Sequence, residues 1–235
     1  MAATGIQRRV TIIVLVLVIL LMLVPIPTTV SAADVAIVEI VSGLAYDSVG
    51  SYTRLSSSGN EFARGGFSEG LLAVEKDGRM GFVDRTGRVV IPLQHNTVYS
   101  FSEGFALIEN SSERFGVIDN TGKVIVAPTY TNAWSFSEGY AAVRTGSRTL
   151  TGRTGFIDNT GKVVVPLEYD VVSSFSEGLS MVFKNQRFGF IDKSGSVIVP
   201  VEYGNARDFT EGLAWLSRDG KRGFIDRSGK VVSRR

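Results

Sequence analysis

The chain has 235 residues, with 25 basic and 23 acidic side chains, no cysteine and one histidine. The lack of cysteine excludes disulfides, thiolate metal sites and a cysteine nucleophile, and a single histidine excludes a multi-histidine metal site. The net charge of +2 provides no basic field for nucleic acid. The 26 glycines against 6 prolines indicate many tight turns rather than a proline-rich disordered chain.

The first 32 residues have the layout of an export signal. Arg8 and Arg9 precede an apolar run over residues 10–24, and small residues up to Ala32 stand where a signal peptidase cleaves. The run has 15 residues, which is short of the roughly 20 that span a membrane. Residues 1–32 are therefore predicted to be a signal peptide, with an uncleaved anchor as the alternative. The protein is predicted to be extracytoplasmic, either secreted or associated with the cell envelope.

Residues 33–66 are predicted to hold an N-terminal strand and a degenerate partial repeat. Residues 34–41 read as a strand, and residues 46–52 align with residues 169–175 further along the chain. The rest of this segment is rich in serine and glycine and is predicted to be a loop.

Residues 67–235 contain five copies of one unit. Each copy opens with Phe-Ser-Glu-Gly, or Phe-Thr-Glu-Gly in the last, and these motifs are spaced by 34, 35, 39 and 34 residues. Each continues with Gly-Phe-Ile-Asp or a near variant and then with Thr/Ser-Gly. The predicted units are residues 67–100, 101–135, 136–174, 175–208 and 209–235. The residues of the structural repeat motif are Phe67, Glu69, Gly70, Gly81, Asp84, Gly87, Phe101, Glu103, Gly104, Gly116, Asp119, Gly122, Phe136, Glu138, Gly139, Gly155, Asp158, Gly161, Phe175, Glu177, Gly178, Gly189, Asp192, Gly195, Phe209, Glu211, Gly212, Gly223, Asp226 and Gly229.

Each unit reads as three short strands that are β-branched or aromatic and bounded by turn residues. In the first unit these are residues 71–74, 81–84 and 89–91, with Asp77-Gly78 as a hairpin turn and Pro92 expected to end the third strand. Both alternating sets of side chains are apolar, so each unit needs neighbours to cover its two faces. The predicted fold is all-β, a tandem repeat of about five three-stranded antiparallel units stacked as an open solenoid or ribbon. The alternative is a closed ring like a small β-propeller, with the N-terminal segment completing the last unit.

The series Phe-Ser-Glu-Gly, Gly-Phe-Ile-Asp, Thr-Gly-Lys-Val-Val and Glu-Tyr resembles the bacterial WG-repeat (KWG) family over residues 67–235. The resemblance implies an all-β repeat in exported or surface-associated proteins and no defined catalytic activity. The chain departs from the family at the tryptophan that precedes the glycine, so no role of that tryptophan is transferred. The residues that replace it are Met80, Phe115, Thr154, Phe188 and Arg222.

No catalytic, cofactor or metal site is predicted. His95 occupies a position where later units have tyrosine, and the chain has no nucleophile motif to accompany it. The motif Asp and Glu residues recur in every unit beside turn glycines, which indicates turn capping or hydrogen bonds between repeats. An array of calcium sites is the alternative for these acids.

The candidate ligand contacts are aromatic and basic residues. Trp134 departs from the repeat pattern on a connecting loop, and the tyrosines recur at one position after the third strand. The third unit carries an insertion, residues 145–153, which holds two arginines. Packing between repeats remains the alternative for the aromatic residues, and a tolerated insertion is the alternative for the loop. The candidate contacts are Trp134, Tyr130, Tyr169, Tyr203, Arg148 and Arg153.

These observations predict an exported, non-enzymatic binding or scaffold module for cell-envelope components or partner proteins. The expected partner is a protein or an envelope glycan, with no nucleic acid, and with a membrane only through an uncleaved N-terminal segment. One alternative is a structural spacer or self-assembling surface protein. The other is a hydrolase, which would depend on His95.

Overall fold

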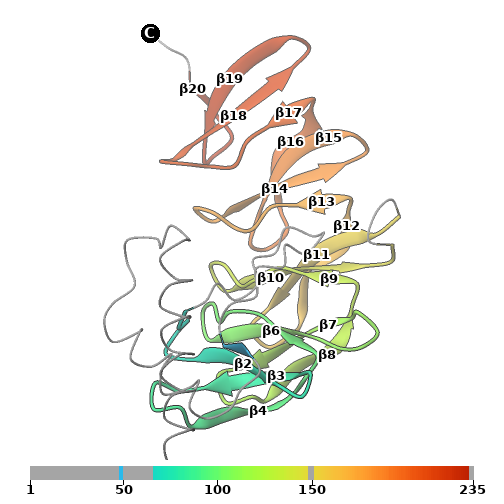
Figure 1. Ribbon diagram of the computed structural model, residues 1–235. Coiled ribbons are helices and arrows are strands. Elements are labelled where there is room, and N and C mark those ends of the chain that lie inside the picture. The colour runs from blue at the N-terminus through green and yellow to red at the C-terminus, as the bar shows by residue number, and fades with distance from the viewer. Residues whose placement is uncertain (1–47, 50–65, 148–150, 233–235) are drawn as a thin grey trace, which may run out of the picture.

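The computed structural model describes residues 48–49, 66–147 and 151–232, which form β-strands and turns (Figure 1). The predicted signal peptide, residues 1–32, and most of segment 33–66 lie outside the described residues. In the described part of the chain, no helix has the length and apolar character needed to cross a membrane.

The strands make up five antiparallel sheets of four strands each. In the first four sheets a two-residue strand is followed by three longer strands, and in the last sheet the fourth strand also has only two residues. Each unit therefore has one short strand more than the three that the sequence predicts. The strands are β1 (Ser48–Val49), β2 (Leu72–Lys76), β3 (Arg79–Val83), β4 (Val89–His95), β5 (Thr97–Val98), β6 (Phe105–Glu109), β7 (Phe115–Asp119), β8 (Val124–Tyr130), β9 (Asn132–Ala133), β10 (Tyr140–Thr145), β11 (Arg153–Asp158), β12 (Val163–Tyr169), β13 (Val171–Val172), β14 (Leu179–Lys184), β15 (Arg187–Asp192), β16 (Val197–Tyr203), β17 (Asn205–Ala206), β18 (Leu213–Arg218), β19 (Lys221–Asp226) and β20 (Val231–Val232).

The hairpin turns between the two central strands follow from local backbone preferences. Between β2 and β3, Asp77 and Gly78 have φ angles of 51° and 69°. Two consecutive positive φ angles define the type I′ turn, whose twist matches that of the strands it joins. The predicted turn at Asp77-Gly78 is therefore present.

In the first four sheets, the last strand contains a bulge where the sequence places proline. In the first sheet Phe82 lies opposite Ile91, but Met80 lies opposite His95, so β4 has two more residues than β3 between these pairs. Pro92 lies inside this bulge, where a missing N–H removes no ladder hydrogen bond. The expectation that Pro92 ends the strand is wrong, because the bulge lets the strand continue to His95.

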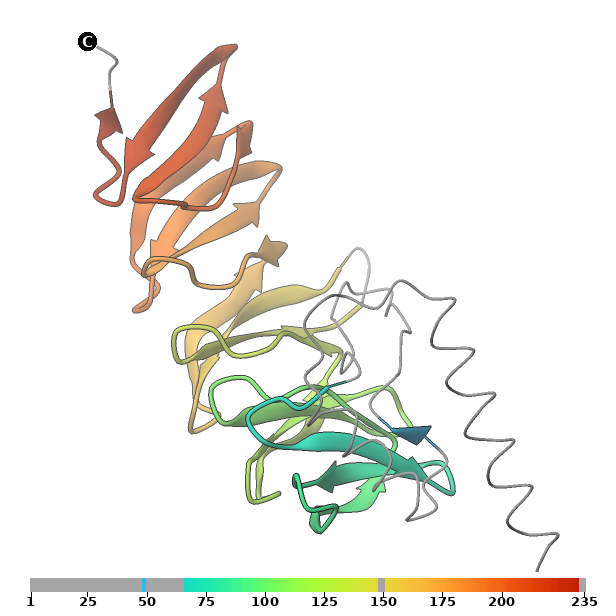
Figure 2. The same ribbon diagram turned by 60° about the vertical axis from the view of Figure 1, so that its left-hand side comes forward.

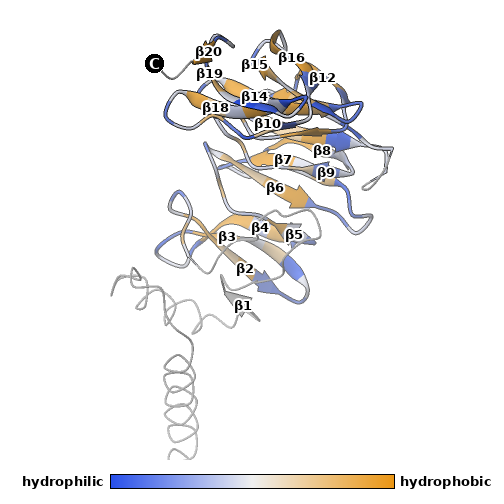
Figure 3. Cartoon of the chain, turned by 90° about the horizontal axis from the view of Figure 1, so that it is seen from above, coloured by the Kyte–Doolittle hydropathy of each residue, from blue (hydrophilic) through white to orange (hydrophobic). Residues whose placement is uncertain are grey.

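The core lies between consecutive sheets. In the first interface, Leu71, Phe82 and Ile91 pack against Val98 and Phe101 of the next sheet. Three further clusters repeat this arrangement along the chain. Hydrophobic colour follows the strands, and the connecting turns are mostly hydrophilic (Figure 3). Burial on both faces of the inner sheets is what the apolar residues at alternating positions predict.

The sheets form an open stack, as the main prediction has it. Figures 1 and 2 show the five sheets following one another in chain order, with the first and the last at opposite ends. The alternative closed ring is not observed. The N-terminal residues Ser48 and Val49 pair with Glu75 and Val74 of the first sheet rather than completing the last one.

Candidate functional site

The Phe-Ser-Glu-Gly motif forms a tight turn that ends in an unusual backbone conformation. In the second unit, backbone hydrogen bonds join Ser102 and Phe105 in both directions, at 2.9 and 3.1 Å. The φ angles of Glu103 and Gly104 are 54° and 83°, which makes this a type I′ turn. A left-handed conformation costs a non-glycine residue on the order of 1 kcal/mol, so a compensating contact is expected. The glutamates that share this conformation are Glu69, Glu103, Glu138, Glu177 and Glu211.

The compensating contact is made by the glutamate side chain. Glu103 accepts hydrogen bonds from the backbone N–H groups of Glu138 and Gly139 in the next unit, both at 2.7 Å. Hydrogen bonds to an ionised acceptor are stronger than neutral ones, so each carboxylate ties two consecutive turns together. The other three contacts of this carboxylate ladder run from Gly104 N to Glu69, from Gly178 N to Glu138 and from Gly212 N to Glu177, at 2.9, 2.9 and 2.8 Å.

Glu138 has an additional partner. Burial opposes ionisation of this carboxyl group, but the Lys193 ammonium group at 3.0 Å and the N–H of Gly178 outweigh it and lower its pKa. The carboxylate is therefore ionised at neutral pH and already occupied by partners within the protein.

Serine and phenylalanine of the same turn also contact neighbouring units. Ser102 Oγ donates a hydrogen bond to the carbonyl oxygen of Phe136 at 2.9 Å, and the Phe136 ring packs on Phe105 with 4.6 Å between centroids. In the first interface, Phe101 packs instead on Phe82, at 4.8 Å. The second unit has valine where the first has Phe82, so Phe105 supplies the missing ring. The motif phenylalanines of the later units are buried packing residues: Phe101, Phe136, Phe175 and Phe209.

The motif aspartates cap the turns before the last long strands. Asp119 Oδ1 accepts hydrogen bonds from the N–H and hydroxyl groups of Thr121, at 2.9 and 2.6 Å, and from the N–H of Lys123 at 3.0 Å. The Thr86 hydroxyl group and the neighbouring N–H groups lower the pKa of the equivalent Asp84 from 3.8 to about 2. The same contacts recur at Asp158, Asp192 and Asp226.

The arrangement of these acids shows no metal geometry. Over residues 48–49, 66–147 and 151–232, no group of three or more His, Cys, Asp or Glu side chains is placed to hold a metal ion. The aspartates face their own turns, and the glutamates face the next unit.

The glycine of the Gly-Phe-Ile-Asp motif permits a close approach of two strands. A Cβ atom at Gly116 would lie 2.5 Å from the Val126 carbonyl oxygen and 2.8 Å from the Pro128 nitrogen. The bulged strand therefore presses directly on this glycine. The residue before it, Phe115, pairs with Tyr130 across the same two strands.

The candidate aromatic contacts lie partly within the packing between sheets. Tyr169 is buried, and Tyr130 and Tyr203 are half-buried against the second and fourth core clusters. Trp134 is half-buried against the third cluster. Each half-buried ring therefore packs on one side and keeps part of its surface in solvent, whereas Tyr169 presents almost none.

His95 is half-buried opposite Met80. Burial lowers its pKa, and its Nε2 atom has no hydrogen-bond partner within the described residues. The equivalent tyrosines of the later units place an apolar ring in the same position.

The insertion in the third unit is organised by a residue that the sequence prediction missed. Arg144 is buried, and its guanidinium group donates to the carbonyl oxygens of Ser147, Gly152 and Asp170, at 3.2, 3.4 and 3.1 Å. Arg144 thereby ties the base of the loop to the connection between the third and fourth sheets. The only sequence signal was an arginine in a strand position that other units fill with glutamate, phenylalanine or serine.

Of the two arginines of the insertion that were predicted as ligand contacts, the structure describes one. Arg153 is exposed and forms an ion pair with Asp170 at 2.7 Å. Arg148 lies outside the described residues. The structure therefore places one of these candidates beside Asp170, at the edge of the third sheet.

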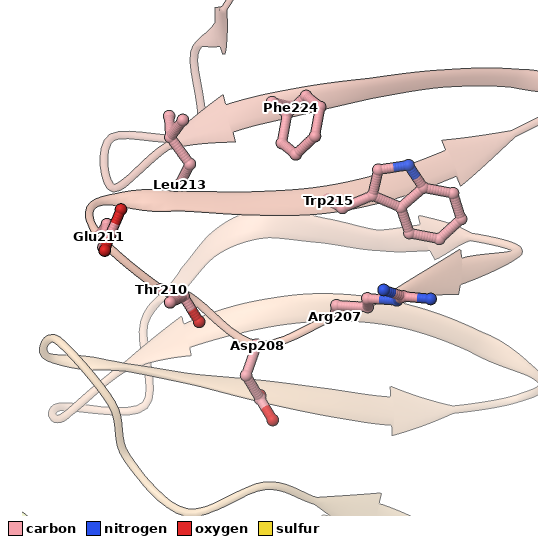
Figure 4. A pocket seen from close by; sticks show the side chains of 7 residues that line it. All are labelled: Arg207, Asp208, Thr210, Glu211, Leu213, Trp215 and Phe224. Atoms are coloured by element: carbon pink, nitrogen blue, oxygen red, sulfur yellow. The ribbon is translucent and has the colours of Figure 1, made fainter.

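A further surface was not predicted from the sequence. A pocket of about 530 Å³ opens on the outer side of the last sheet (Figure 4). Its ring Phe224 is 46% exposed, whereas the equivalent Phe190 of the fourth sheet is 1% exposed under Phe209. These residues occupy ordinary motif positions, so only their lack of a covering sheet sets them apart. The pocket is lined by Arg207, Asp208, Thr210, Glu211, Leu213, Trp215 and Phe224.

The fold and its turns define a class of antiparallel β-repeat arrays in which a glutamate of each unit is hydrogen-bonded to the turn of the next unit. The family model described as WG containing repeat matches residues 80–111, 115–148, 155–187 and 188–221. These matches cover more than half of the chain, which therefore belongs to the WG-repeat family.

Comparison with solved structures finds low similarity to several proteins. The computationally designed Ika8 protein is 14% identical with a TM-score of 0.39, and the alignment covers 69% of this chain and 57% of that one. BamB from Moraxella catarrhalis is 12% identical with a TM-score of 0.39, covering 71% and 58%. The WD40 β-propeller domain of Doa1 is 11% identical with a TM-score of 0.35, covering 70% and 64%.

The chain thus spans less than two thirds of the length of these three structures, and the likeness assigns no activity. A search of the curated proteins found none that matches the chain.

Proposed function

We propose that this protein is an exported, non-enzymatic scaffold that binds a protein or a glycan of the cell envelope. The observation that carries the proposal is the internal use of the repeated polar side chains. The glutamates bind the next turn and the aspartates bind their own, so the recurring acids serve architecture. The layout of residues 1–32 supports the proposed export.

The third sheet, β9–β12, is the proposed binding region. Three departures from the repeat meet there: Trp134 directly after β9, the loop between β10 and β11, and Arg144 beneath that loop. A half-buried indole is held rigidly by its packed side, so binding its open side to a ligand costs little conformational entropy. The ion pair of Arg153 with Asp170 adds polar groups at the edge of the same sheet.

Retention of envelope components by the purified, immobilised protein tests this function. Trp134→Ala is expected to reduce retention by roughly tenfold or more, the usual size of a tryptophan hot spot. Phe188→Ala is the matched control, because it removes a half-buried aromatic ring from the fourth sheet, and it should retain the ligand at the wild-type level. Failure of the wild-type protein to retain any envelope component, or equal retention by the Trp134→Ala variant, would contradict the proposal.

A second candidate function is a structural spacer that assembles through strand edges. A valine at the start of the last strand in each sheet is exposed by 43–64%. These side chains form a recurring apolar row beside the turns, and exposed strand edges are templates for pairing. The residues of this row are Val89, Val124, Val163, Val197 and Val231.

A further inference from the structure

The outer side of the last sheet has the same groups that bind the following unit everywhere else in the molecule. We call Thr210, Glu211, Leu213, Trp215 and Phe224 the end face. Glu211 and Thr210 belong to the turn, and Leu213, Trp215 and Phe224 lie along the two adjoining strands (Figure 4).

The four interior interfaces show what such a face binds. In the interface between the fourth and fifth units, the Ser176 hydroxyl group donates to the Phe209 carbonyl oxygen at 3.4 Å, and Glu177 accepts from Gly212 N at 2.8 Å. The Phe209 ring packs edge-on against Phe190 at 5.0 Å. The fourth unit thus contributes a hydroxyl donor, a carboxylate acceptor and a phenylalanine ring. These groups bind, in that order, the carbonyl oxygen, the amide N–H and the phenylalanine ring of the turn in the fifth unit.

The end face has the same hydroxyl, carboxylate and ring, but no following turn binds them within the described residues. Thr210 carries the hydroxyl group of the usual serine, and Glu211 keeps the left-handed φ of 53° that the ladder glutamates share. Within the described ranges, the carboxylate of Glu211 receives no hydrogen bond from a following turn, and Phe224 remains 46% exposed. The pocket of about 530 Å³ lies where the next phenylalanine would pack.

At the other end of the array, the backbone groups of the complementary set have no partner within the described residues. In the first turn, Ser68 and Glu69 bind the second unit through Phe101 O and Gly104 N. The groups that face the opposite way are the Phe67 carbonyl oxygen and the N–H of Gly70, which have no hydrogen bond in the part of the chain that the structure describes. The Phe67 ring packs against its own sheet and has the Arg85 guanidinium carbon 4.6 Å from its centroid. It is nevertheless only half-buried, whereas its four equivalents are 2–4% exposed, so a second copy would have to displace or share the Arg85 contact.

The end face and the first turn therefore carry complementary groups. We propose that the end face binds the Phe67–Gly70 turn of a second copy of this chain. Phe67 packs on Phe224, the Thr210 hydroxyl group donates to the Phe67 carbonyl oxygen, and Glu211 accepts from the N–H of Gly70. The contact is head-to-tail and heterologous, so it extends the array into a ring or an open chain of molecules.

The small size of the proposed contact between two copies limits its affinity. Leu72, Val74 and Val83, on the same side of the first sheet as Phe67, are already buried at 0–2% exposure. The second copy consequently contributes a turn and a ring rather than a whole sheet face. Small interfaces of this kind are transient, so association is expected to be weak and to depend on protein concentration.

This inference rests on the proposed scaffold function, since it names the surface through which the scaffold is extended. Sedimentation velocity on the full chain, expressed with its own N-terminal segment, tests it over a wide concentration range. The average mass is expected to rise with concentration for the wild-type protein. Phe224→Ser should abolish this rise, and Glu211→Gln should raise the dissociation constant by roughly tenfold, the effect of losing one charge-assisted hydrogen bond.

Two variants separate the proposed geometry from other modes of association. Phe67→Ala alters the opposite half of the interface and should also abolish association. Asp219→Asn, a change at an exposed hairpin of the same last sheet, should associate as the wild type does. Circular dichroism on each variant shows whether it is folded.

Three outcomes would overturn the inference. The first is a wild-type protein that remains monomeric at every concentration. The second is loss of association in Phe224→Ser but not in Phe67→Ala, which indicates two end faces packed on each other. The third is association unchanged in both variants, which indicates pairing through strand edges. The retention assay is independent of all three, so a protein that binds envelope components but stays monomeric contradicts only this inference.

Discussion

At the scale of the residue, the two recurring acids of each unit have different structural roles. The aspartate caps a turn within its own unit, whereas the glutamate leaves its own turn and binds the next one. The glutamate also adopts a backbone conformation that favours glycine, at φ angles of 51–54°. Its carboxylate contact offsets that cost, because the same turn aims the side chain at the amide groups of the neighbouring unit.

This division of roles predicts unequal effects of one substitution in two units. Glu103→Ala removes an acceptor of two hydrogen bonds and is expected to lower the free energy of unfolding by about 1–3 kcal/mol. Glu211→Ala has the same backbone strain but no following turn, so it should change the free energy of unfolding by less than about 0.5 kcal/mol. Urea unfolding of both variants at low protein concentration measures the difference. Equal losses would show that the ladder contributes nothing to stability.

At the scale of the element, each of the first four sheets is shaped by an aspartate turn and a bulge. The aspartate turn starts the last long strand, and the bulge around the proline brings that strand onto the motif glycine. The glycine is required by this contact rather than by a positive φ angle, since a Cβ atom at Gly116 would lie 2.5 Å from a carbonyl oxygen.

The aspartate turns predict a loss of stability in acid. The pKa of Asp84 falls from 3.8 to about 2 in the folded protein, mainly through the Thr86 hydroxyl group, and the pKa of the four equivalent aspartates is also lowered. Because the unfolded chain takes up these protons first, the stabilisation is complete above about pH 4 and is lost as the pH falls towards about 2. Urea midpoints measured across this range should decrease steadily.

A pair of variants isolates the contribution of one turn. Asp119→Asn retains a carbonyl acceptor but cannot ionise, so it should reduce the dependence of the midpoint on pH. Asp219→Asn, on a hairpin where the aspartate is 77% exposed, should leave that dependence unchanged. If both variants follow the wild-type curve, the capped aspartates are not the source of the acid sensitivity.

At the scale of the whole molecule, stability resides in the interfaces between consecutive sheets. Each inner sheet is covered on both faces, whereas the last sheet keeps one face open, with Phe224 46% exposed and Leu213 39% exposed. Repeat arrays of this kind are stabilised by nearest-neighbour contacts, so the same residue contributes differently at the middle and at the end.

The prediction at this scale compares one motif position in two adjacent sheets. Phe190→Ala opens a cavity in the interface with the fifth unit and is expected to cost about 3–5 kcal/mol. Phe224→Ala removes a ring that is largely in solvent already and should cost less than about 1 kcal/mol. Urea unfolding followed by fluorescence and circular dichroism measures both losses. A similar cost for the two variants would mean that the last sheet is covered in solution.

Much of the architecture was predictable from the sequence because the repeat recurs five times. Local rules were sufficient for the turns: Asp77-Gly78 and the Thr/Ser-Gly positions have the backbone angles that their residue types favour. The two-residue strands were missed, because residues such as Thr97 and Val98 carry no periodicity that could be read over so short a length. The continuation through Pro92 was also missed, because a bulge depends on the partner strand.

For the candidate contact residues, too, the sequence could not reveal features that depend on tertiary contacts. Trp134 departs from the repeat in the sequence itself, so the sequence could single it out as a candidate. Arg144 was not found, since its function depends on three carbonyl groups that only the folded loop brings together. The end face was not found either, because Phe224 and Phe190 are the same residue in the same motif and differ only in what lies above them.

The sequence by itself determined the repeat, its longer strands, its turns and the need for neighbouring units, because these follow from local backbone preferences and from apolar residues on both faces of a short strand. The tertiary structure alone decided that the stack stays open, that glutamate rather than aspartate joins the units, and which phenylalanine is exposed. Those properties depend on contacts between residues about 35 positions apart, at distances that no local pattern encodes.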